Sequence, residues 1–291
     1  MGTEETRPGG TENLCCAPAG NKGRGPTNFT QRARKGSGMD AFAGRHVVVT
    51  GGGRGIGEAI AERLAAEGAT LSLLAPNVEE LEAVAARVGG GAHACDIRDR
   101  EGVDAAFAAA AGARGPIHAL VANSGVGGPN EDGPDDRFAE IVYTNLFGTY
   151  WCIRAAVRHL APGPDARHVV VIASILARIA VPGYTAYSAS KAGLLGLVRS
   201  FSAELAPEQV QVNAICPGWV ETDMARQGID AIVAATGMSR EEAHAEAMKA
   251  VPLGRMGQPE DIAGTVRWLL SGDARGVTGQ AIDQNGGAWT G

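Results

Sequence analysis

Short apolar runs alternate with stretches of helical periodicity from residue 44 to the end of the chain. This alternation constrains the fold most, because a parallel sheet buried on both faces needs continuous apolar strands joined by helical crossovers. The sequence therefore predicts a single α/β domain: a doubly wound parallel sheet of about seven strands with helices on both faces. The expected strands are 46–50, 71–74, 92–95, 118–122, 169–173, 210–215 and 278–283.

Helical stretches fill the intervals between these strands. The expected helices are 60–68, 78–88, 103–111, 137–160, 187–205 and 259–270. Residues 223–250 break the strand–helix rhythm, and we expect them to form a small helical flap over a substrate site. The predicted catalytic domain spans 41–291.

Residues 1–40 differ in composition from the rest of the chain. They are rich in Gly, Pro, Thr, Asn and Arg and lack apolar periodicity, which predicts a disordered N-terminal extension. The charged residues of this segment are not followed by the apolar stretch of a signal peptide. Its arginines leave a transit peptide open as an alternative, and Met39 is a second possible start of translation.

Charge and cysteine content narrow the class of protein. The formal net charge of -6 offers no basic field, so nucleic acid is not an expected partner. The five cysteines form no CxxC pair, which favours a reducing, cytoplasmic location. The most apolar stretch, 169–181, is interrupted by Arg178 and is too short to cross a membrane. The six histidines show no metal-ligand spacing, so no metal is expected.

A glycine-rich turn, T-G-G-G-R-G-I-G over residues 50–57, joins the first strand to the first helix. Glycines allow a tight turn and a close approach of phosphate to the backbone, and the helix N-terminus supplies free N–H groups. The turn lacks the lysine of a P-loop and does not follow the G-x-G-x-x-G pattern. A purely structural turn is the alternative, but the position between a buried strand and a helix favours a dinucleotide site.

The turn resembles that of the short-chain dehydrogenase/reductase superfamily. Asp96, the 123–125 Asn-Ser-Gly turn and the Pro-Gly segment at 217–218 resemble further motifs of that family, with Ala122 where a first Asn is common. The resemblance covers about 44–291 and implies a Rossmann fold that binds a nicotinamide cofactor. The cofactor-binding residues it implies are Gly51, Gly53, Arg54, Gly55, Ile56, Gly57, Asp96, Ile97, Asn123, Gly125, Tyr187, Lys191, Pro217, Gly218, Val220 and Thr222.

The second strand bears on the choice between the two nicotinamide cofactors. A carboxylate at its end would bind the ribose hydroxyls of NAD(H), but residues 74–77 read L-A-P-N and contain no acid. Its absence permits the 2′-phosphate of NADP(H), which Arg54 could contact. The arginine that often follows this strand in NADP-dependent members is missing, with Pro76 in its place. The sequence favours NADP(H) and leaves NAD(H) open.

A Tyr-x-x-x-Lys pair opens the helix expected at 187–205. Tyr187 and Lys191 lie on one helical face, because positions i and i+4 are neighbours. A fixed ammonium group stabilises phenolate, so the pattern predicts a lowered pKa for Tyr187 and proton exchange near neutral pH. By itself, a Tyr-x-x-x-Lys spacing is also common on helix surfaces. Ser174, thirteen residues earlier and after the fifth strand, strengthens the catalytic reading.

The resemblance assigns roles to four residues. Ser174 hydrogen-bonds the substrate carbonyl and Tyr187 transfers the proton. Lys191 lowers the pKa of Tyr187 and holds the nicotinamide ribose, while Asn145 marks a helix distortion that anchors a relay water. The structural alternatives are a turn or cap for Ser174 and a buried amide bridging backbone groups for Asn145. Hydride passes directly between cofactor and carbon.

Substrate contacts are expected from apolar residues after the later strands and on the flap. The candidate pocket residues are Val126, Ile175, Leu176, Tyr184, Trp219, Met224 and Met238. They favour a bulky or aliphatic ketone, although several could merely pack the flap onto the sheet. The flap weakly resembles those of ketoreductases that act on acyl-carrier or polyketide substrates.

These features predict NADPH-dependent reduction of a 3-oxoacyl or polyketide-type ketone, whether a small molecule or an acyl thioester. An NAD-linked alcohol or hydroxyacyl dehydrogenase acting oxidatively is the alternative enzyme, and a catalytically silent nucleotide sensor is the alternative outside catalysis. The resemblance implies a homotetramer, with a dimer as the second choice.

Overall fold

The computed structural model describes residues 41–163, 165 and 167–291. The predicted disordered extension, residues 1–40, lies outside the described residues, so the boundary at residue 41 stays a prediction. Among the helices that are described, none combines the length and apolar character that a bilayer crossing requires.

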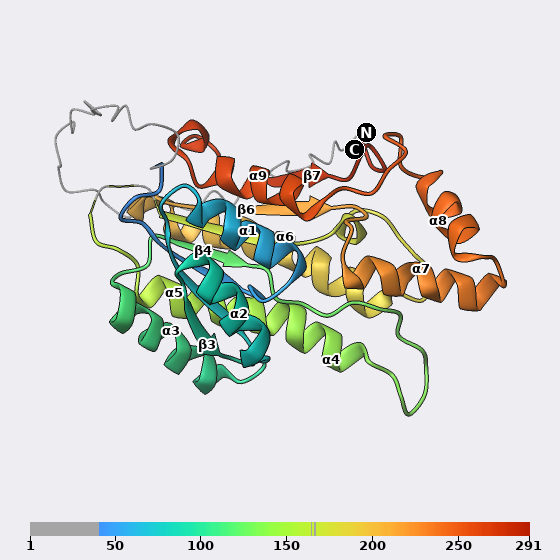
Figure 1. Ribbon diagram of the computed structural model, residues 1–291, viewed down its shortest axis with the longest axis horizontal. Coiled ribbons are helices and arrows are strands. Elements are labelled where there is room, and N and C mark those ends of the chain that lie inside the picture. Colours follow the sequence, from blue (N-terminus) through green and yellow to red (C-terminus); the bar gives the residue numbers. More distant parts are fainter. Residues whose placement is uncertain (1–40, 164, 166) are drawn as a thin grey trace, which may run out of the picture. The chain divides into compact units, whose positions relative to one another are not determined.

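Seven parallel strands form one sheet in the order β3-β2-β1-β4-β5-β6-β7 (Figure 1). The strands are β1 (His46–Thr50), β2 (Thr70–Ala75), β3 (Gly91–Ala94), β4 (Ala119–Ala122), β5 (Arg167–Ile172), β6 (Val210–Pro217) and β7 (Ala281–Gln284). The predicted doubly wound α/β fold is thereby confirmed. The strand order reverses direction between β1 and β4, and in such sheets ligands bind in the crevice beyond the carboxyl ends of these strands.

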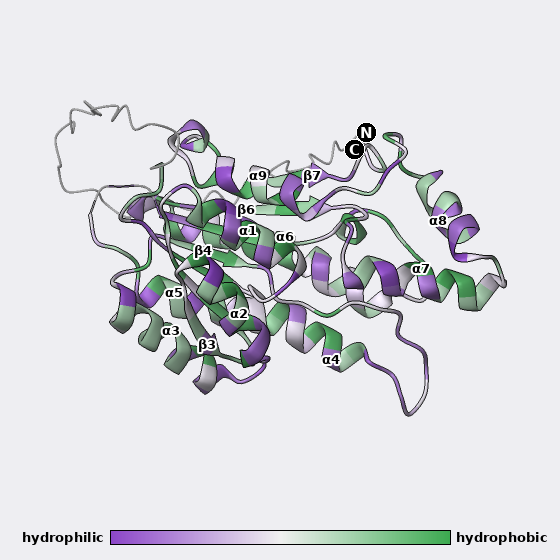
Figure 2. Ribbon diagram, viewed as in Figure 1, coloured by the Kyte–Doolittle hydropathy of each residue, from purple (hydrophilic) through white to green (hydrophobic). Residues whose placement is uncertain are grey.

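The chain covers both faces of this sheet with helices. The helical segments along the sheet are α1 (Gly55–Ala65), α2 (Val78–Val88), α3 (Arg100–Arg114), α4 (Phe138–Val142), the π-helical turn η1 (Tyr143–Gly148), α5 (Thr149–Arg158), α6 (Thr185–Leu205) and α9 (Pro259–Leu269). The two-residue period of a strand explains the layering, since Val47 and Val49 pack with α1, α2 and α9 while Val48 packs with α3, α5 and α6. In Figure 2 the central strands are correspondingly green.

The flap predicted at 223–250 consists of two helices, α7 (Asp223–Thr236) and α8 (Arg240–Met248). They stand at the right-hand end of the sheet in Figure 1. A cluster of buried side chains joins them, and we call it the flap cluster: Ala225, Ile229, Ala243, Met248, Val251 and Met256. The flap therefore has an apolar core separate from the two cores that flank the sheet.

The last strand begins later than the sequence predicted. β7 starts at Ala281 rather than at residue 278. Gly279 adopts φ of 72°, which interrupts an extended strand, and a side chain there would meet the Ser202 hydroxyl at 2.8 Å. The segment before β7 is hydrogen-bonded to β6 through a side chain in place of a regular backbone ladder: Thr278 Oγ1 accepts from the Val212 N–H at 3.0 Å.

His168 makes the stability of the fold pH-dependent. It lies on β5 with 2% exposure, neither ring nitrogen has a hydrogen-bond partner among the described residues, and burial lowers its pKa from 6.5 to about 4. Because the folded state disfavours the charged ring, the contribution is complete above pH 6.5 and is lost as pH falls toward 4. We expect His168→Leu to flatten the pH dependence of the free energy of unfolding by roughly 2–3 kcal/mol over this interval.

Denaturant unfolding of the wild type and His168→Leu at pH 7.5, 6 and 4.5 measures this difference. Taking the difference between the two proteins removes the contribution of carboxylates, which titrate in both. Parallel pH profiles for the two proteins would show that His168 has no such effect.

Candidate active site

The glycine-rich turn after β1 has a backbone that only glycine can follow at three points. Gly51 and Gly55 have φ of 66° and 56°. A Cβ on Gly57 would lie 2.0 Å from the Gly51 carbonyl oxygen, so the first turn of α1 packs directly against the end of the glycine turn. The sequence pattern identified these positions because this close approach admits no side chain.

Asn123 holds the glycine turn from the neighbouring strand β4. Its Nδ2 donates to the carbonyl oxygens of Thr50 and Gly51, each at 3.1 Å. The Thr50 hydroxyl accepts in return from the backbone N–H groups of Asn123 and Ser124 at 3.0 and 3.1 Å. The Asn123 side chain, predicted to bind cofactor, thus positions the turn that would bind the cofactor phosphates.

The N-terminus of α1 is suited to an anion. Arg54 is the N-cap residue and makes no side-chain cap, so the first N–H groups of α1 have no capping partner from it. Gly53, Gly55 and Ile56 surround this end, and a Cβ on Gly55 would touch the Thr222 methyl at 3.4 Å. A dinucleotide pyrophosphate fits a cradle of bare backbone at a helix N-terminus.

Asp96, one of the predicted cofactor-binding residues, has its carboxylate already paired. Asp96 accepts from Arg98 through both side chain and backbone, the shorter side-chain contact being 2.6 Å, and this hydrogen bonding lowers the pKa of Asp96. Ile97 is 5% exposed and lies against Gly148. At the end of β2, Asn77 caps α2 by accepting from two backbone N–H groups.

The segment after β6 links the sheet to the flap. β6 ends at Pro217, and the Gly218 N–H donates to the Gln284 carbonyl at 3.1 Å. Val220 is buried, and Thr222 caps α7 by accepting from the Ala225 N–H at 3.3 Å. The flap therefore begins where this segment meets the glycine turn.

Tyr187 and Lys191 occupy the first turns of α6, one helical turn apart as predicted. The Lys191 Nζ lies 5.5 Å from the centre of the Tyr187 ring and donates to the Ile172 carbonyl, at the end of β5, at 3.0 Å. Lys191 is 4% exposed. The hydrogen bond to Ile172 fixes the ammonium group beside the phenol.

The predicted lowering of the Tyr187 pKa is wrong for this structure. Burial raises the pKa of Tyr187 above its usual 10, and a hydrogen bond with Ser174 opposes that rise only in part. Burial also lowers the pKa of Lys191 to about 8. Desolvation penalises both charged forms, and a spacing pattern cannot reveal this because burial is set by the surrounding elements.

Ser174 follows β5 and caps a turn, as the structural alternative predicted, while its contact with a substrate carbonyl stays a prediction. It caps the 3₁₀ turn η2 (Ile175–Ala177), its hydroxyl accepting from the Leu176 N–H at 3.1 Å. The same hydroxyl hydrogen-bonds Tyr187. The side chain is 8% exposed, at the carboxyl end of the strand next to β4.

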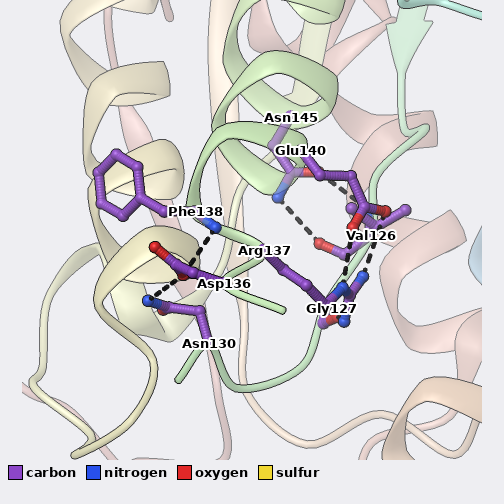
Figure 3. Close-up of polar contacts among 8 residues, drawn as sticks. All are labelled: Val126, Gly127, Asn130, Asp136, Arg137, Phe138, Glu140 and Asn145. Carbon is purple, nitrogen blue, oxygen red and sulfur yellow. Dashed lines mark hydrogen bonds and ion pairs between the residues drawn. The ribbon is translucent and has the colours of Figure 1, made fainter. Parts of the chain in front are cut away.

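Asn145 lies within the π-helical turn η1, so the predicted helix distortion is present. Its Oδ1 accepts from the Val126 N–H at 2.8 Å and its Nδ2 donates to the Val126 carbonyl at 2.9 Å, as Figure 3 shows. A Cβ on Gly125 would lie 3.0 Å from this Oδ1 and 3.4 Å from the Lys191 Nζ. The amide therefore does bridge backbone groups, within reach of the Tyr–Lys pair.

Two residues that were not predicted from the sequence, Ser190 and Asn130, hold this arrangement together. Ser190 is fully buried, accepts from Asn145 Nδ2 at 3.1 Å and donates to the Tyr187 carbonyl at 2.8 Å. Asn130 accepts from the Ala186 N–H at 2.9 Å, which ties the β4–α4 loop to the start of α6. The position of Ser190 next to Lys191 in the Tyr-x-x-Ser-Lys run could have identified it from the sequence. No sequence pattern marks Asn130.

The predicted pocket residues divide into two groups. Val126, Ile175, Leu176 and Tyr184 belong to the segments around Asn145, Ser174 and Tyr187, and the Met224 sulfur lies 2.9 Å from where a Cβ on Gly127 would be. Trp219 and Met238 instead pack against the flap cluster, in agreement with the packing alternative.

Comparison with known proteins decides the family. A family model described as enoyl-(acyl carrier protein) reductase matches residues 51–288. The 3-oxoacyl-[acyl-carrier-protein] reductase MabA of Mycobacterium avium is 32% identical over 271 residues, covering 90% of this chain and 96% of the relative. The chain belongs to the short-chain dehydrogenase/reductase family. As a member of it, the protein is an NAD(P)-dependent oxidoreductase acting on CH–OH groups.

Solved structures of short-chain dehydrogenases/reductases agree with this assignment. An actinorhodin polyketide ketoreductase variant with NADPH superposes with a TM-score of 0.79 at 32% identity, covering 84% of this chain and 97% of that one. A levodione reductase superposes with a TM-score of 0.76 at 30% identity, covering 84% and 98%.

Proposed function

We propose that the protein uses NADPH to reduce the ketone of a 3-oxoacyl or polyketide-type substrate. One observation carries the proposal: the Ser174 hydroxyl, the Tyr187 phenol and the Lys191 ammonium group lie together where β5 ends, beside a glycine turn shaped for a dinucleotide. The relatives named for 3-oxoacyl reduction and the ketoreductase with NADPH support the substrate class and the cofactor.

Each side chain has a part in the reduction. When bound, the nicotinamide cofactor would supply hydride to the carbonyl carbon. Ser174 and Tyr187 both donate hydrogen bonds to the carbonyl oxygen, which stabilises the negative charge that develops there. Tyr187 then gives its proton to that oxygen, and Lys191, still charged, stabilises the phenolate left behind.

Arg54 supports the choice of NADPH. Its side chain is 68% exposed at the glycine turn, and Ala75, Pro76 and Asn77 offer no carboxylate to the cofactor ribose. A guanidinium group binds phosphate well and would distinguish NADPH from NADH. Arg54→Gln is the direct test: NADPH should bind at least about tenfold more weakly while NADH binding changes little. Equal losses for the two cofactors would contradict this role.

The substrate class is tested by a screen of NADPH oxidation over 3-oxoacyl thioesters, cyclic ketones and quinones, repeated with NADH. Preferred turnover of 3-oxoacyl thioesters with NADPH supports the proposal. Preferred oxidation of a hydroxyacyl substrate with NAD would instead support the oxidative alternative, and no turnover with either cofactor would support a nucleotide sensor.

Reduction should weaken in alkaline solution because of Lys191. Its pKa of about 8 means that the ammonium group is charged below pH 8 and neutral above it, whereas the raised pKa of Tyr187 keeps the phenol protonated through this range. We expect kcat/KM for NADPH, which reports groups of the free enzyme, to be flat below pH 7 and to decline above pH 8. A flat profile up to pH 9.5 would contradict this assignment.

We also propose a homotetramer, with a dimer as the alternative, in the cytoplasm. Phe138, Tyr143 and Phe147 expose apolar rings along α4 and η1, and Tyr143 stacks on Phe147 with ring centroids 5.3 Å apart. Such a row of aromatic side chains suits a helix-to-helix contact between copies. Light scattering after size exclusion measures the mass, and a monomer would reject both assemblies.

A further inference from the structure

Arg54, the residue proposed to bind the 2′-phosphate of NADPH, is paired with a carboxylate from the flap. Its Nη1 lies 3.4 Å from Asp223 Oδ2, and Asp223 is the first residue of α7. The second carboxylate oxygen, Oδ1, accepts from Arg226 at 2.5 Å. Asp223 thus stands between two guanidinium groups, one on the glycine turn and one on the flap.

A second contact, made by neither Arg54 nor Asp223, also brings the two segments together. Thr222, the N-cap residue of α7, lies within van der Waals distance of Gly55, because its methyl would be 3.4 Å from a Cβ there. The first residue of α7 therefore follows immediately on a segment in contact with the start of α1. Any anion bound by Arg54 would share this space with the Asp223 carboxylate.

The charges around Asp223 do not cancel its effect. Arg226 is shared with Glu221, which lies 3.3 Å from it, so this guanidinium faces two carboxylates. The Asp223 carboxylate is exposed and ionised at neutral pH, and its hydrogen bond to Arg226 lowers its pKa further below the usual 3.8. A phosphate dianion arriving at Arg54 would meet a fixed negative charge and would have to displace it.

We propose that Asp223 is a specificity-determining residue that holds Arg54 and opposes binding of the cofactor 2′-phosphate. NADH lacks that phosphate and therefore encounters only the opposition to the pyrophosphate, which it shares with NADPH. The flap helix α7 thereby takes part in the choice between the two cofactors. The inference rests on the proposed function, since it requires Arg54 to serve the 2′-phosphate.

Asp223→Asn removes the charge and keeps the shape. We expect the dissociation constant for NADPH, titrated by nicotinamide fluorescence, to fall by about three- to tenfold at low ionic strength, the size expected for one charge near a phosphate in water. The constant for NADH should stay within about twofold. Raising the salt to about 0.5 M should remove most of the difference, because screening acts on exposed charges and a structural change would persist.

Asp230→Asn is the matched control. Asp230 lies on the same helix, is similarly exposed and pairs with Arg240 at 2.5 Å. It should leave both dissociation constants unchanged. An unchanged NADPH constant in Asp223→Asn would overturn the proposal, as would an equal shift for NADPH and NADH or the same shift in Asp230→Asn.

Arg54→Gln separates this inference from the proposed cofactor role. If Arg54→Gln weakens NADPH selectively, the proposed role of Arg54 stands and Asp223→Asn is judged by its own titration. If Arg54→Gln has no selective effect, that role fails. In the Arg54→Gln background, loss of the Asp223→Asn effect supports action through Arg54, and an undiminished effect overturns it.

Discussion

Replacing Tyr187 with Phe should reduce kcat for ketone reduction by about a thousandfold, because positioned acid catalysis commonly contributes this much. The phenylalanine ring fills the same space, and Lys191 keeps its hydrogen bond to the Ile172 carbonyl. Binding of NADPH should therefore change little. Steady-state NADPH oxidation and a fluorescence titration of NADPH measure the two quantities on one sample.

Ser188→Ala serves as the control for Tyr187→Phe. Ser188 is the next residue of α6, and its buried hydroxyl has no hydrogen-bond partner in the part of the chain that the structure describes. Its removal should leave kcat within about twofold, since no bond is lost. Near-normal turnover by Tyr187→Phe would remove the phenol from the mechanism, and equal losses in both variants would indicate general damage to α6.

A methyl group at Gly57 should abolish tight cofactor binding. The Cβ of Gly57→Ala would lie 2.0 Å from the Gly51 carbonyl oxygen and 2.7 Å from Asn123 Nδ2, so the glycine turn has to open. We expect a loss of NADPH affinity of about ten- to a hundredfold and a decrease in the free energy of unfolding of about 1–3 kcal/mol. Fluorescence titration and denaturant unfolding test the two effects.

The matched substitution is Gly264→Ala in α9. Apart from the backbone of the helix itself and the two adjacent residues, no atom of the described part of the chain lies within 4 Å of a Cβ built at Gly264, which is inside a helix. Alanine should therefore stabilise the fold by about 0.5–1 kcal/mol without altering cofactor affinity. Unchanged NADPH binding in Gly57→Ala would show that the glycine turn does not hold the cofactor.

Local signals allowed much of the fold to be predicted. Helix α2 has its predicted bounds, and the structure shows that Asn77 caps its start and that Gly89, with φ of 64°, ends it. The predicted runs overlap all seven strands. The inner strands β1, β4, β5 and β6 are buried along their whole length between two layers of helices, whereas the edge strands β3 and β7 are only partly buried. The sequence did not predict the late start of β7, because that start depends on a hydrogen bond between Thr278 and β6.

Those properties of the candidate site that depend on packing could not be predicted from the sequence. Spacing placed Tyr187 and Lys191 on one face of a helix, but desolvation decided the direction of both pKa values. The resemblance located Asn145, although only the structure shows its double hydrogen bond to Val126. The pairing of Arg54 with Asp223 joins residues 169 positions apart, and no local pattern could indicate it.

The flap cluster has a consequence for how such an enzyme diversifies. Ile229, Ala243 and Met248 are buried against one another, apart from the side chains that hold the helices to the sheet. In the proposed function the flap covers the substrate, so substitutions within that cluster would reshape the substrate site while the sheet and the Tyr–Lys helix keep their own support. A chimaera that exchanges residues 219–256 between related reductases should therefore inherit the ketone preference of the donor and the thermal tolerance of the recipient.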